Sequence, residues 1–458
     1  MLFSLGFSYT FETTTRSQDD AHSPDTRTME GEDRIAPDQE IDFCTLGMFI
    51  IDEIHYLPPT PPVFNILGGA GSFSALGARL FSPPPLSRTV SWIVDKGSDF
   101  PPSLTTQITS WQTSCLIRED ANRLTTRGWN GYDTSQNRAF KYTTPKLRLT
   151  TDSLTPTLLL SKSFHLICSP TRCIELVTAI LRARKALNKS IEKPLFIWEP
   201  VPDLCLPTEL LNCTNCLPYI DILSPNAHEL AGFMGDLGSE IDPITNEVSK
   251  PWVERACEQL LGSMPLQSYA LVIRCGAQGC YIAKNGGRSR RPSKSLKRRR
   301  PANHARGGLT LDMDMSTLFL GLLDDEGSLI REEEVPIDPG IERWLPAYFQ
   351  DTPPSTTSMS GESDGESLIG KVVDPTGGGN GFLGGLAVAL ARGRGVVEAS
   401  CWGSVAASFM IEQVGMPILS SAPPSSLGEG EGEESSKELW NNVSVEERLE
   451  AYLKRVGL

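Results

Sequence analysis

Short apolar runs alternate with longer amphipathic segments over most of the chain. The apolar runs are typical of strands that a parallel sheet buries on both faces, and they lie at residues 43–52, 90–94, 158–168, 195–200, 220–223 and 269–274. The segments 172–187 and 397–414 have helical character. Strands that alternate with helices in this way predict an α/β fold with right-handed β-α-β crossovers.

Polar segments divide this pattern into one large domain and its accessory parts. The domain is expected at 41–420. Within this domain, about 105–150 is expected to form a small β-sheet with aromatic side chains. A charged helix is expected at 441–458. Segments with few apolar residues cannot offset the entropy cost of ordering them. We expect a disordered tail at 1–40 and an acidic linker at 421–440. We also expect two disordered insertions, a basic one at 285–309 and a polar one at 351–370.

Composition narrows the class of protein. Of the 458 residues 39% are hydrophobic, enough for a sizeable core, and the net charge of −14 argues against nucleic-acid or anionic-membrane binding by the molecule as a whole. No apolar run reaches the ~18 residues of a membrane span. The scattered cysteines are typical of reduced intracellular thiols. We expect a cytoplasmic protein, and the basic run 297–300 is a solvated loop, a nuclear-import signal or a patch that binds a phosphate backbone.

The stretch from Lys371 to Arg392 carries the strongest chemical signal. A short apolar run ends at Asp374, a glycine turn follows at Gly377–Gly379, and an Ala-rich helix comes next. Backbone N–H groups at a helix N-terminus, when no side chains obstruct them, form a positive pocket that suits a phosphate. The alternative is that these glycines only make a tight turn between a strand and a helix.

Residues 374–382 resemble the signature of the PfkB (ribokinase-like) carbohydrate kinases. They read Asp-x-Thr-Gly-Gly-Gly-Asn-x-Phe, where the family usually has Asp-Thr-x-Gly-Ala-Gly-Asp-x-Phe. Four further pairs follow the order of the family's motifs along the chain: Gly47/Asp52, Gly68/Gly69, Asn226/Glu229 and Gly276/Gly279. The resemblance covers about 43–417, and it implies a ribokinase-like three-layer α/β/α sandwich with a mainly parallel sheet and a small β-lid.

The resemblance also implies a function and roles for particular residues. It implies a kinase that uses ATP and Mg²⁺ to phosphorylate a small-molecule alcohol, either a sugar or a nucleoside. The implied anion hole and base position are Gly377, Gly378, Gly379 and Asn380; the acceptor site is Asp52, Gly68, Gly69 and Phe73; the nucleotide site is Asn226, Glu229, Arg274, Gly276, Gly279, Asp374 and Thr376. Asn226 and Glu229 would hold Mg²⁺ through water, although their spacing also fits a helix capping box.

Three residues depart from the family pattern. Asn380 stands where the family has the Asp that acts as general base, Phe73 where it has a substrate-binding Asn, and Pro375 displaces the usual Thr. An amide has no useful basicity near pH 7, and a positioned base typically supplies about 10²–10⁴ in rate. Two functions stay open: a kinase, or a weak or inactive pseudokinase that binds a nucleotide or acts as a scaffold, with protein partners at the insertions.

Overall fold

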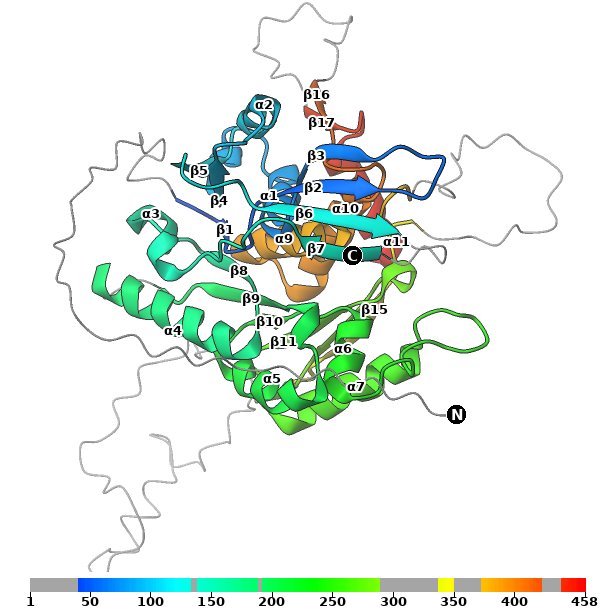
Figure 1. Ribbon diagram of the computed structural model, residues 1–458. Helices are drawn as coiled ribbons and strands as arrows, with labels where there is room; N and C mark the ends of the chain where they lie inside the picture. The colour runs from blue at the N-terminus through cyan, green and yellow to red at the C-terminus, as the bar shows by residue number, and fades with distance from the viewer. Residues whose placement is uncertain (1–39, 133–137, 188–191, 289–336, 350–371, 422–437) are drawn as a thin grey trace, which may run out of the picture. The chain divides into compact units, whose positions relative to one another are not determined.

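Figure 1 shows a computed structural model of the chain. It describes residues 40–132, 138–187, 192–288, 337–349, 372–421 and 438–458. The predicted tail, the two insertions and the linker fall almost wholly outside these ranges, as does the basic run 297–300, so they stay predictions. No helix within the described ranges is both long enough and apolar enough to cross a membrane.

A nine-stranded sheet forms the middle layer, with the strand order β15-β12-β11-β10-β9-β8-β1-β4-β5. Neighbours from β11 to β5 pair in parallel, while β12 and β15 pair antiparallel at one edge. The mainly parallel sheet that the sequence predicts is therefore confirmed. The strands are Phe43–Thr45 (β1), Val90–Gly97 (β4), Ser114–Asp120 (β5), Ser163–Cys168 (β8), Leu195–Pro200 (β9), Ile222–Leu223 (β10), Ala270–Arg274 (β11), Cys280–Lys284 (β12) and Ile341–Leu345 (β15).

Helices cover both faces of this sheet (Figure 1). Apolar side chains of α1, α2, α9, α10 and α11 join one core cluster, and those of α3 to α7 join a second cluster. This arrangement is the predicted three-layer sandwich. The helices are Ala70–Leu80 (α1), Pro102–Ser110 (α2), Pro156–Leu159 (α3), Pro170–Leu187 (α4), Leu210–Cys216 (α5), Ala227–Met234 (α6), Lys250–Ser263 (α7), Gly378–Ala391 (α9), Val396–Met410 (α10) and Val445–Val456 (α11).

Alternate side chains of the central strands enter the two clusters. In β9, Phe196 and Trp198 belong to the cluster of α3 to α7, while Ile197 belongs to the other; in β11, Leu271 and Val272 divide in the same way. Successive side chains of a strand point to opposite faces, so a strand covered on both faces is apolar at nearly every position. This is why continuous apolar runs predict these strands correctly.

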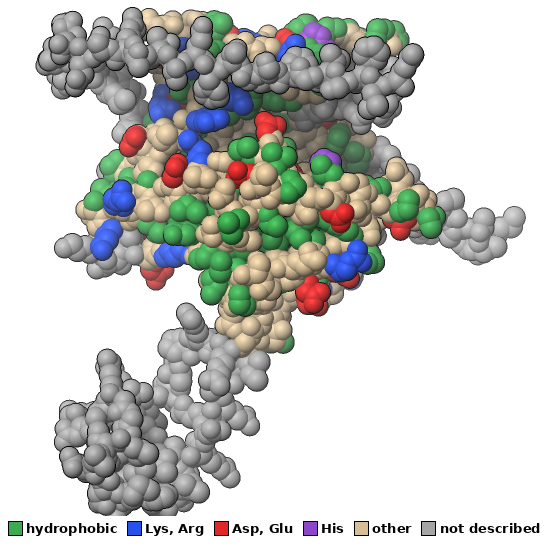
Figure 2. Space-filling model, turned by 60° about the horizontal axis from the view of Figure 1, so that its bottom comes forward, with side chains coloured by type: hydrophobic (Ala, Val, Ile, Leu, Met, Phe, Trp, Pro, Cys, Tyr) green, Lys and Arg blue, Asp and Glu red, His purple; other side chains and the backbone are tan. Residues whose placement is uncertain are grey.

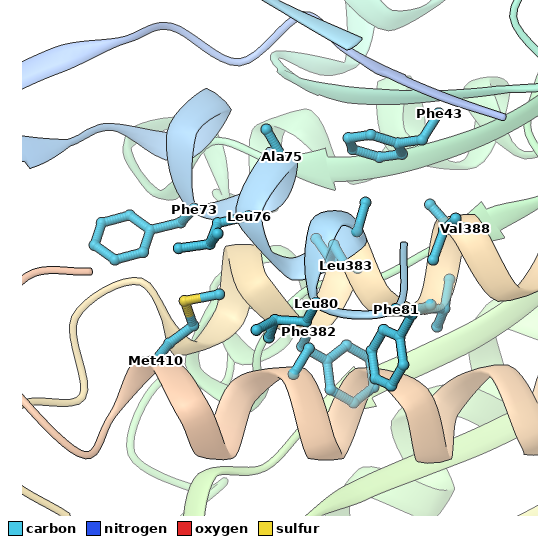
Figure 3. Close-up of a cluster of buried hydrophobic side chains, with 14 of the residues drawn as sticks. Phe43, Phe73, Ala75, Leu76, Leu80, Phe81, Phe382, Leu383, Val388 and Met410 are labelled. Carbon is cyan, nitrogen blue, oxygen red and sulfur yellow. The ribbon is translucent and has the colours of Figure 1, made fainter. Parts of the chain in front are cut away.

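Helices α1, α9 and α10 pack together, and Figure 3 shows side chains of this part of the core, together with Phe43 of β1. Glycines set the distance between α1 and α9. A Cβ on Gly77 would overlap the backbone of Gly381, and a Cβ on Gly384 would overlap the backbone of Ser74. The two helices are therefore in backbone contact at two levels.

Four strands form a second, smaller sheet with the order β3-β2-β6-β7. They are Ile50–His55 (β2), Val63–Gly68 (β3), Arg127–Tyr132 (β6) and Arg138–Tyr142 (β7). A small sheet was expected at about 105–150, and its role as a β-lid stays a prediction. Strands β2 and β3 come from 50–68, and within 105–150 the segments α2 and β5 join the main sandwich instead.

The apolar run 43–52 is not one strand, as the sequence suggested, but two strands in different sheets. Strand β1 lies in the large sheet and β2 in the small one, and residues 46–49 connect them. Gly47 in this connection lies so close to the start of α1 that a Cβ on it would be 2.6 Å from the Gly71 nitrogen. The chain therefore turns away from the large sheet at α1, a non-local contact that the apolar pattern does not reveal.

Two other predicted strands differ from the structure. The run 158–168 begins inside α3, which Thr155 caps with its side chain and Pro156 starts, and only its second half forms β8. Val372 and Val373 are exposed (52% and 61%) and form no strand before the glycine turn.

Two short antiparallel pairs complete the described strands: Gly287–Arg288 (β13) with Ile337–Asp338 (β14), and Leu419–Ser421 (β16) with Glu438–Trp440 (β17). Figure 2 turns forward the end of the molecule that carries α5 and α7 in Figure 1. Acidic, basic and hydrophobic side chains are interspersed on the described part of that face.

Candidate functional site

The glycine turn lies at the N-terminus of α9. Gly377 is the N-cap residue, and its φ of 79° is a left-handed value that favours glycine. The ring of Phe73 packs so closely that a Cβ on Gly377 would overlap it. The first N–H groups of a helix have no partner within the helix, and its dipole is positive at this end. The turn therefore has the geometry of an anion site, although the predicted strand before it is missing.

Phe73 lies in the hydrophobic core. Its side chain is buried, and Figure 3 places it near Leu76 of α1 and Met410 of α10. The ring supports the glycine turn from the side of α1. The structure thus gives Phe73 a packing role, and its contact with an acceptor stays a prediction.

Asp52 lies in the middle of β2 and not at the end of a central strand. Its carboxylate is buried over two glycines of neighbouring strands: a Cβ on Gly68 would overlap Oδ2, and a Cβ on Gly128 would lie 2.6 Å from Oδ1. Gly69, the N-cap of α1, follows with a φ of 87°. Asp52 and Gly68, both predicted at the acceptor end of the site, are therefore in contact.

Asn380, at the predicted base position, faces a carboxylate. Its Nδ2 donates a hydrogen bond of 2.6 Å to Oε2 of Glu199. Glu199 is buried and stands next to the last residue of β9. The amide is therefore oriented by a carboxylate that the sequence did not single out.

Glu199 is the centre of a buried polar network. Its Oε1 lies 2.8 Å from Nη2 of Arg274, and its Oε2 lies 3.3 Å from Nε2 of His165, whose Nδ1 lies 3.0 Å from Oγ1 of Thr45. Burial raises the pKa of Glu199, but the charge of Arg274 and the contacts with His165 and Asn380 outweigh burial and bring the pKa below its usual value. Glu199 is therefore ionised near neutral pH and is a weak base.

Asn226 and Glu229 form a capping box at the start of α6. The Asn226 side chain accepts a hydrogen bond from the Glu229 N–H at 2.8 Å, and the Glu229 carboxylate accepts one from the Asn226 N–H at 2.7 Å. Oε2 of Glu229 also lies 3.3 Å from Nη2 of Arg274. The capping box thus joins the network around Glu199 through Arg274.

A cavity of about 470 Å³ adjoins this network. Asn226, Arg274 and Gly276, all predicted to contact a nucleotide, line it together with residues 246–248. Its volume is within the range of small-molecule sites. Gly279 shapes the neighbouring hairpin instead, because its φ is 85° and a Cβ there would overlap the backbone of β15.

Asp374 and Thr376 lie in the turn just before α9. Oδ1 of Asp374 accepts a hydrogen bond of 2.9 Å from the Thr376 N–H. The other carboxylate oxygen, Oδ2, and the Thr376 hydroxyl are buried and have no hydrogen-bond partner among the described residues. Buried polar atoms without partners are uncommon, so these two atoms mark a place where a ligand would supply the missing partners.

Comparison with curated proteins places the chain in a family. It is 31% identical over 424 residues to Protein MAK32 of Saccharomyces cerevisiae, and the match covers 90% of this chain and 92% of that protein. The chain belongs to the MAK32 family. An uncharacterized protein of Schizosaccharomyces pombe is 29% identical over 417 residues, which cover 91% of this chain and 94% of that protein. No family model matches the chain.

Solved structures show the fold of this MAK32-family protein. Ribokinase from Giardia lamblia matches with a TM-score of 0.52 at 14% identity, over 91% of this chain and 100% of that one. Ribokinase from Cryptococcus neoformans in complex with ADP matches with a TM-score of 0.50 at 14% identity, over 82% of this chain and 95% of that one. A probable sugar kinase from Rhizobium etli matches with a TM-score of 0.51 at 12% identity, over 82% of this chain and 94% of that one. The ribokinase-like fold predicted from the sequence is therefore confirmed.

Two residues of the candidate site, Glu199 and His165, are not predicted from the sequence. Both are polar residues inside apolar strands, and that contrast is a signal the sequence contains. Glu199 also stands near the C-terminal end of its strand, where open α/β sheets bind their ligands. Asp52, which ends the apolar run 43–52, lies instead in the small sheet.

The pH dependence of stability should report on Glu229. Burial raises its pKa from 4.5 to about 6, against the attraction of Arg274. A carboxyl group whose folded-state pKa is raised favours folding below its ordinary pKa, and this contribution is lost as the pH rises through the folded-state value. In Glu229→Gln, which keeps a capping side chain, this loss should be absent. The wild type should therefore lose about 2 kcal/mol relative to the variant between about pH 4 and about pH 7.

Urea unfolding of both proteins across that pH range measures the difference between their free energies of unfolding. Parallel pH profiles would contradict the expected behaviour of Glu229.

Proposed function

We propose that this protein binds ATP at the glycine turn and the adjoining cavity, as a pseudokinase in which phosphoryl transfer to an alcohol is strongly slowed. The observation that carries the proposal is the hydrogen bond from Asn380 to Glu199. The position of the general base is held by an amide, and the nitrogen of this amide is engaged with a buried carboxylate.

The surroundings of the turn support nucleotide binding. The N-terminus of α9 offers backbone N–H groups and a positive dipole end. The guanidinium of Arg274 lies beside the turn, because a Cβ on Gly379 would overlap its Nη1. The buried Thr376 hydroxyl lacks a partner among the described residues. The Cryptococcus neoformans ribokinase, which shares the fold, was solved with ADP.

Slow transfer follows from the lack of a free base. A neutral amide such as that of Asn380 does not accept a proton at physiological pH. Glu199 is a carboxylate, but its two oxygens are engaged with Arg274, Asn380 and His165. Those contacts also lower its pKa, which weakens it as a base. Loss of general-base catalysis alone costs about 10²–10⁴ in rate.

The residues suit a phosphate better than they suit Mg²⁺. The oxygen of Asn226 and the carboxylate of Glu229, which the resemblance assigned to the cation, are engaged in the capping box. Within the described ranges, no cluster of three or more His, Cys, Asp or Glu side chains is arranged to hold a metal ion. Mg²⁺ requires oxygen ligands in a near-octahedral arrangement, so its fit here is poor.

A second candidate function is a slow kinase that acts on a sugar, a nucleoside or a similar alcohol. Glu199 favours it, because its Oε2 is only 2.6 Å from the Asn380 nitrogen and a carboxylate thus adjoins the base position. Asp52, in contact with Gly68, would bind hydroxyl groups of the acceptor. ADP release that depends on an added alcohol would favour this candidate over the pseudokinase.

Calorimetric titration with ATP tests the proposed function, and Gly379→Ala is its most direct variant. The new methyl group would overlap Nη1 of Arg274, so we expect at least about tenfold weaker binding, the equivalent of one hydrogen bond to a charged group. The matched control is Gly395→Ala at the N-cap of α10, where a Cβ meets no neighbour within 4 Å in the part of the chain that the structure describes.

The control should bind ATP as the wild type does. Wild-type protein that binds no ATP, or equal affinity in the two variants, would argue against a nucleotide at the glycine turn.

A further inference from the structure

We propose that Arg274 takes the place of the divalent cation in this site, so that ATP binding gains nothing from Mg²⁺. The inference rests on the proposed nucleotide binding and adds its cation requirement.

One nitrogen of Arg274 lies among three oxygens. Nη2 is 2.8 Å from Oε1 of Glu199, 3.3 Å from Oε2 of Glu229, and donates to the Ser224 carbonyl oxygen at 3.1 Å. Two carboxylates and a backbone carbonyl are a ligand set that otherwise suits a hard cation. A guanidinium nitrogen occupies the space between them, so a metal ion would first have to displace this side chain.

The Arg274 side chain is held firmly in this position. The side chain is 12% exposed. The backbone of the residue is held as well, because the Arg274 N–H donates to the carbonyl oxygen of Pro225 at 3.1 Å. On the opposite side, Nη1 lies against the backbone of Gly379. Displacement of the guanidinium would leave Glu199 and Glu229 buried without a compensating charge, which is strongly unfavourable.

The same guanidinium is placed to serve a phosphate. Its Nε is buried and has no hydrogen-bond partner in the part of the chain that the structure describes, so one donor is left over. Arginine stays charged throughout the physiological pH range and binds phosphate oxygens through N–H groups of fixed geometry. The residue therefore reaches from the two carboxylates to the glycine turn, and its guanidinium offers hydrogen-bond donors to a phosphate at the place where phosphoryl sites usually hold a metal.

The test compares ATP binding to the full wild-type chain in EDTA and in excess Mg²⁺, by calorimetry. We expect dissociation constants within about threefold of each other. Binding that is at least about tenfold tighter with Mg²⁺ would overturn the inference and leave the proposed function standing. No binding under either condition would overturn both.

Removal of the guanidinium gives a second, nucleotide-free test with Mn²⁺ as a spectroscopic probe. In Arg274→Gln the carboxylates of Glu199 and Glu229 lose their counter-charge, so the variant should bind Mn²⁺ and the wild type should not. Arg255→Gln, which changes an exposed arginine of α7, is the matched control and should behave as the wild type does.

Electron paramagnetic resonance counts the bound Mn²⁺ in each protein. Mn²⁺ binding by the wild type that disappears in Glu229→Gln would overturn the inference, whether or not Arg274→Gln folds.

Discussion

Asn380→Asp, which introduces the carboxylate usual in PfkB kinases, is expected to destabilise this protein by about 2–4 kcal/mol near pH 8 without restoring catalysis. The nitrogen that it replaces lies 2.6 Å from Oε2 of Glu199. In the variant an oxygen would face an oxygen at this place, and two carboxylates so close cannot both ionise without a large cost. The substitution that restores the family's usual residue in the sequence is therefore expected to lower the stability of the folded protein.

The destabilisation should increase with pH. Repulsion raises the pKa of one carboxyl group of the pair, so that near about pH 4 the two groups share a proton and form a hydrogen bond. A group with a raised folded-state pKa contributes stability below its ordinary pKa and loses it as the pH rises through the raised value. The variant should therefore approach the wild type in acid and fall below it in mild base.

Reversal of the hydrogen bond should rescue the variant. In the double variant Glu199→Gln/Asn380→Asp, a glutamine amide donates to an aspartate at the base position, so the bond is reversed and the pair keeps a single carboxylate, at the cost of the charge that faces Arg274. We expect this protein to recover most of the lost stability. Any acceptor-dependent ADP release should rise by about 10²–10⁴ over the wild type.

Urea unfolding at several pH values and an ADP-release assay measure the two effects. The control is Asn65→Asp, an exposed position whose side-chain oxygen accepts a hydrogen bond from Arg127, so the added charge is compensated there. A stable and active Asn380→Asp single variant would show that Glu199 does not constrain the base position.

Arg79→Leu should cause the second large effect, a loss of about 3–5 kcal/mol in the free energy of unfolding. The Arg79 side chain is wholly buried, and its Nη atoms lie 2.7 and 2.9 Å from the two carboxylate oxygens of Glu438. It also donates to the carbonyl oxygens of Trp111 at 2.6 Å and Ser82 at 2.9 Å. Leucine would leave these buried acceptors without a donor.

The urea midpoint measures this loss, and Arg394→Leu is the matched control. The Arg394 side chain is 52% exposed, and among the described residues its ion pair is an i,i+4 pair of 3.4 Å with Glu398. Exposed pairs of this kind contribute at most a few tenths of a kcal/mol, about 0.5 at most. Similar midpoints for the two variants would mean that the buried network around Arg79 adds little to stability.

The sequence predicts those parts of the fold that depend on local patterns. Central strands such as β9 and β11 are apolar on both faces, and this leaves a continuous run in the sequence. Asn226 and Glu229 form their capping box from a spacing of three residues, and the glycine turn starts α9 as its composition suggests.

Contacts between distant segments are what the sequence does not reveal. Asn380 and Glu199 are 181 positions apart, and nothing in either segment indicates that they meet. The same reason explains why the apolar pattern of 43–52 predicts a single strand: its break depends on the approach of Gly47 to Gly71. The role of Asn380 therefore depends on its contact with Glu199, which the sequence does not predict.

The glycine contacts between α1 and α9 limit how this site can change in evolution. Strand β3 and Gly69 lead directly into α1, at the predicted acceptor end, while α9 begins at the glycine turn. Gly77 and Gly381 bring the two helices into backbone contact. No residue is smaller than glycine, and a side chain at Gly77 would overlap the backbone of α9. The spacing between the two ends of the site is therefore fixed by this contact. Relatives that accommodate ligands of different size would have to do so through the small sheet, the part of the site whose strands are not locked to α9.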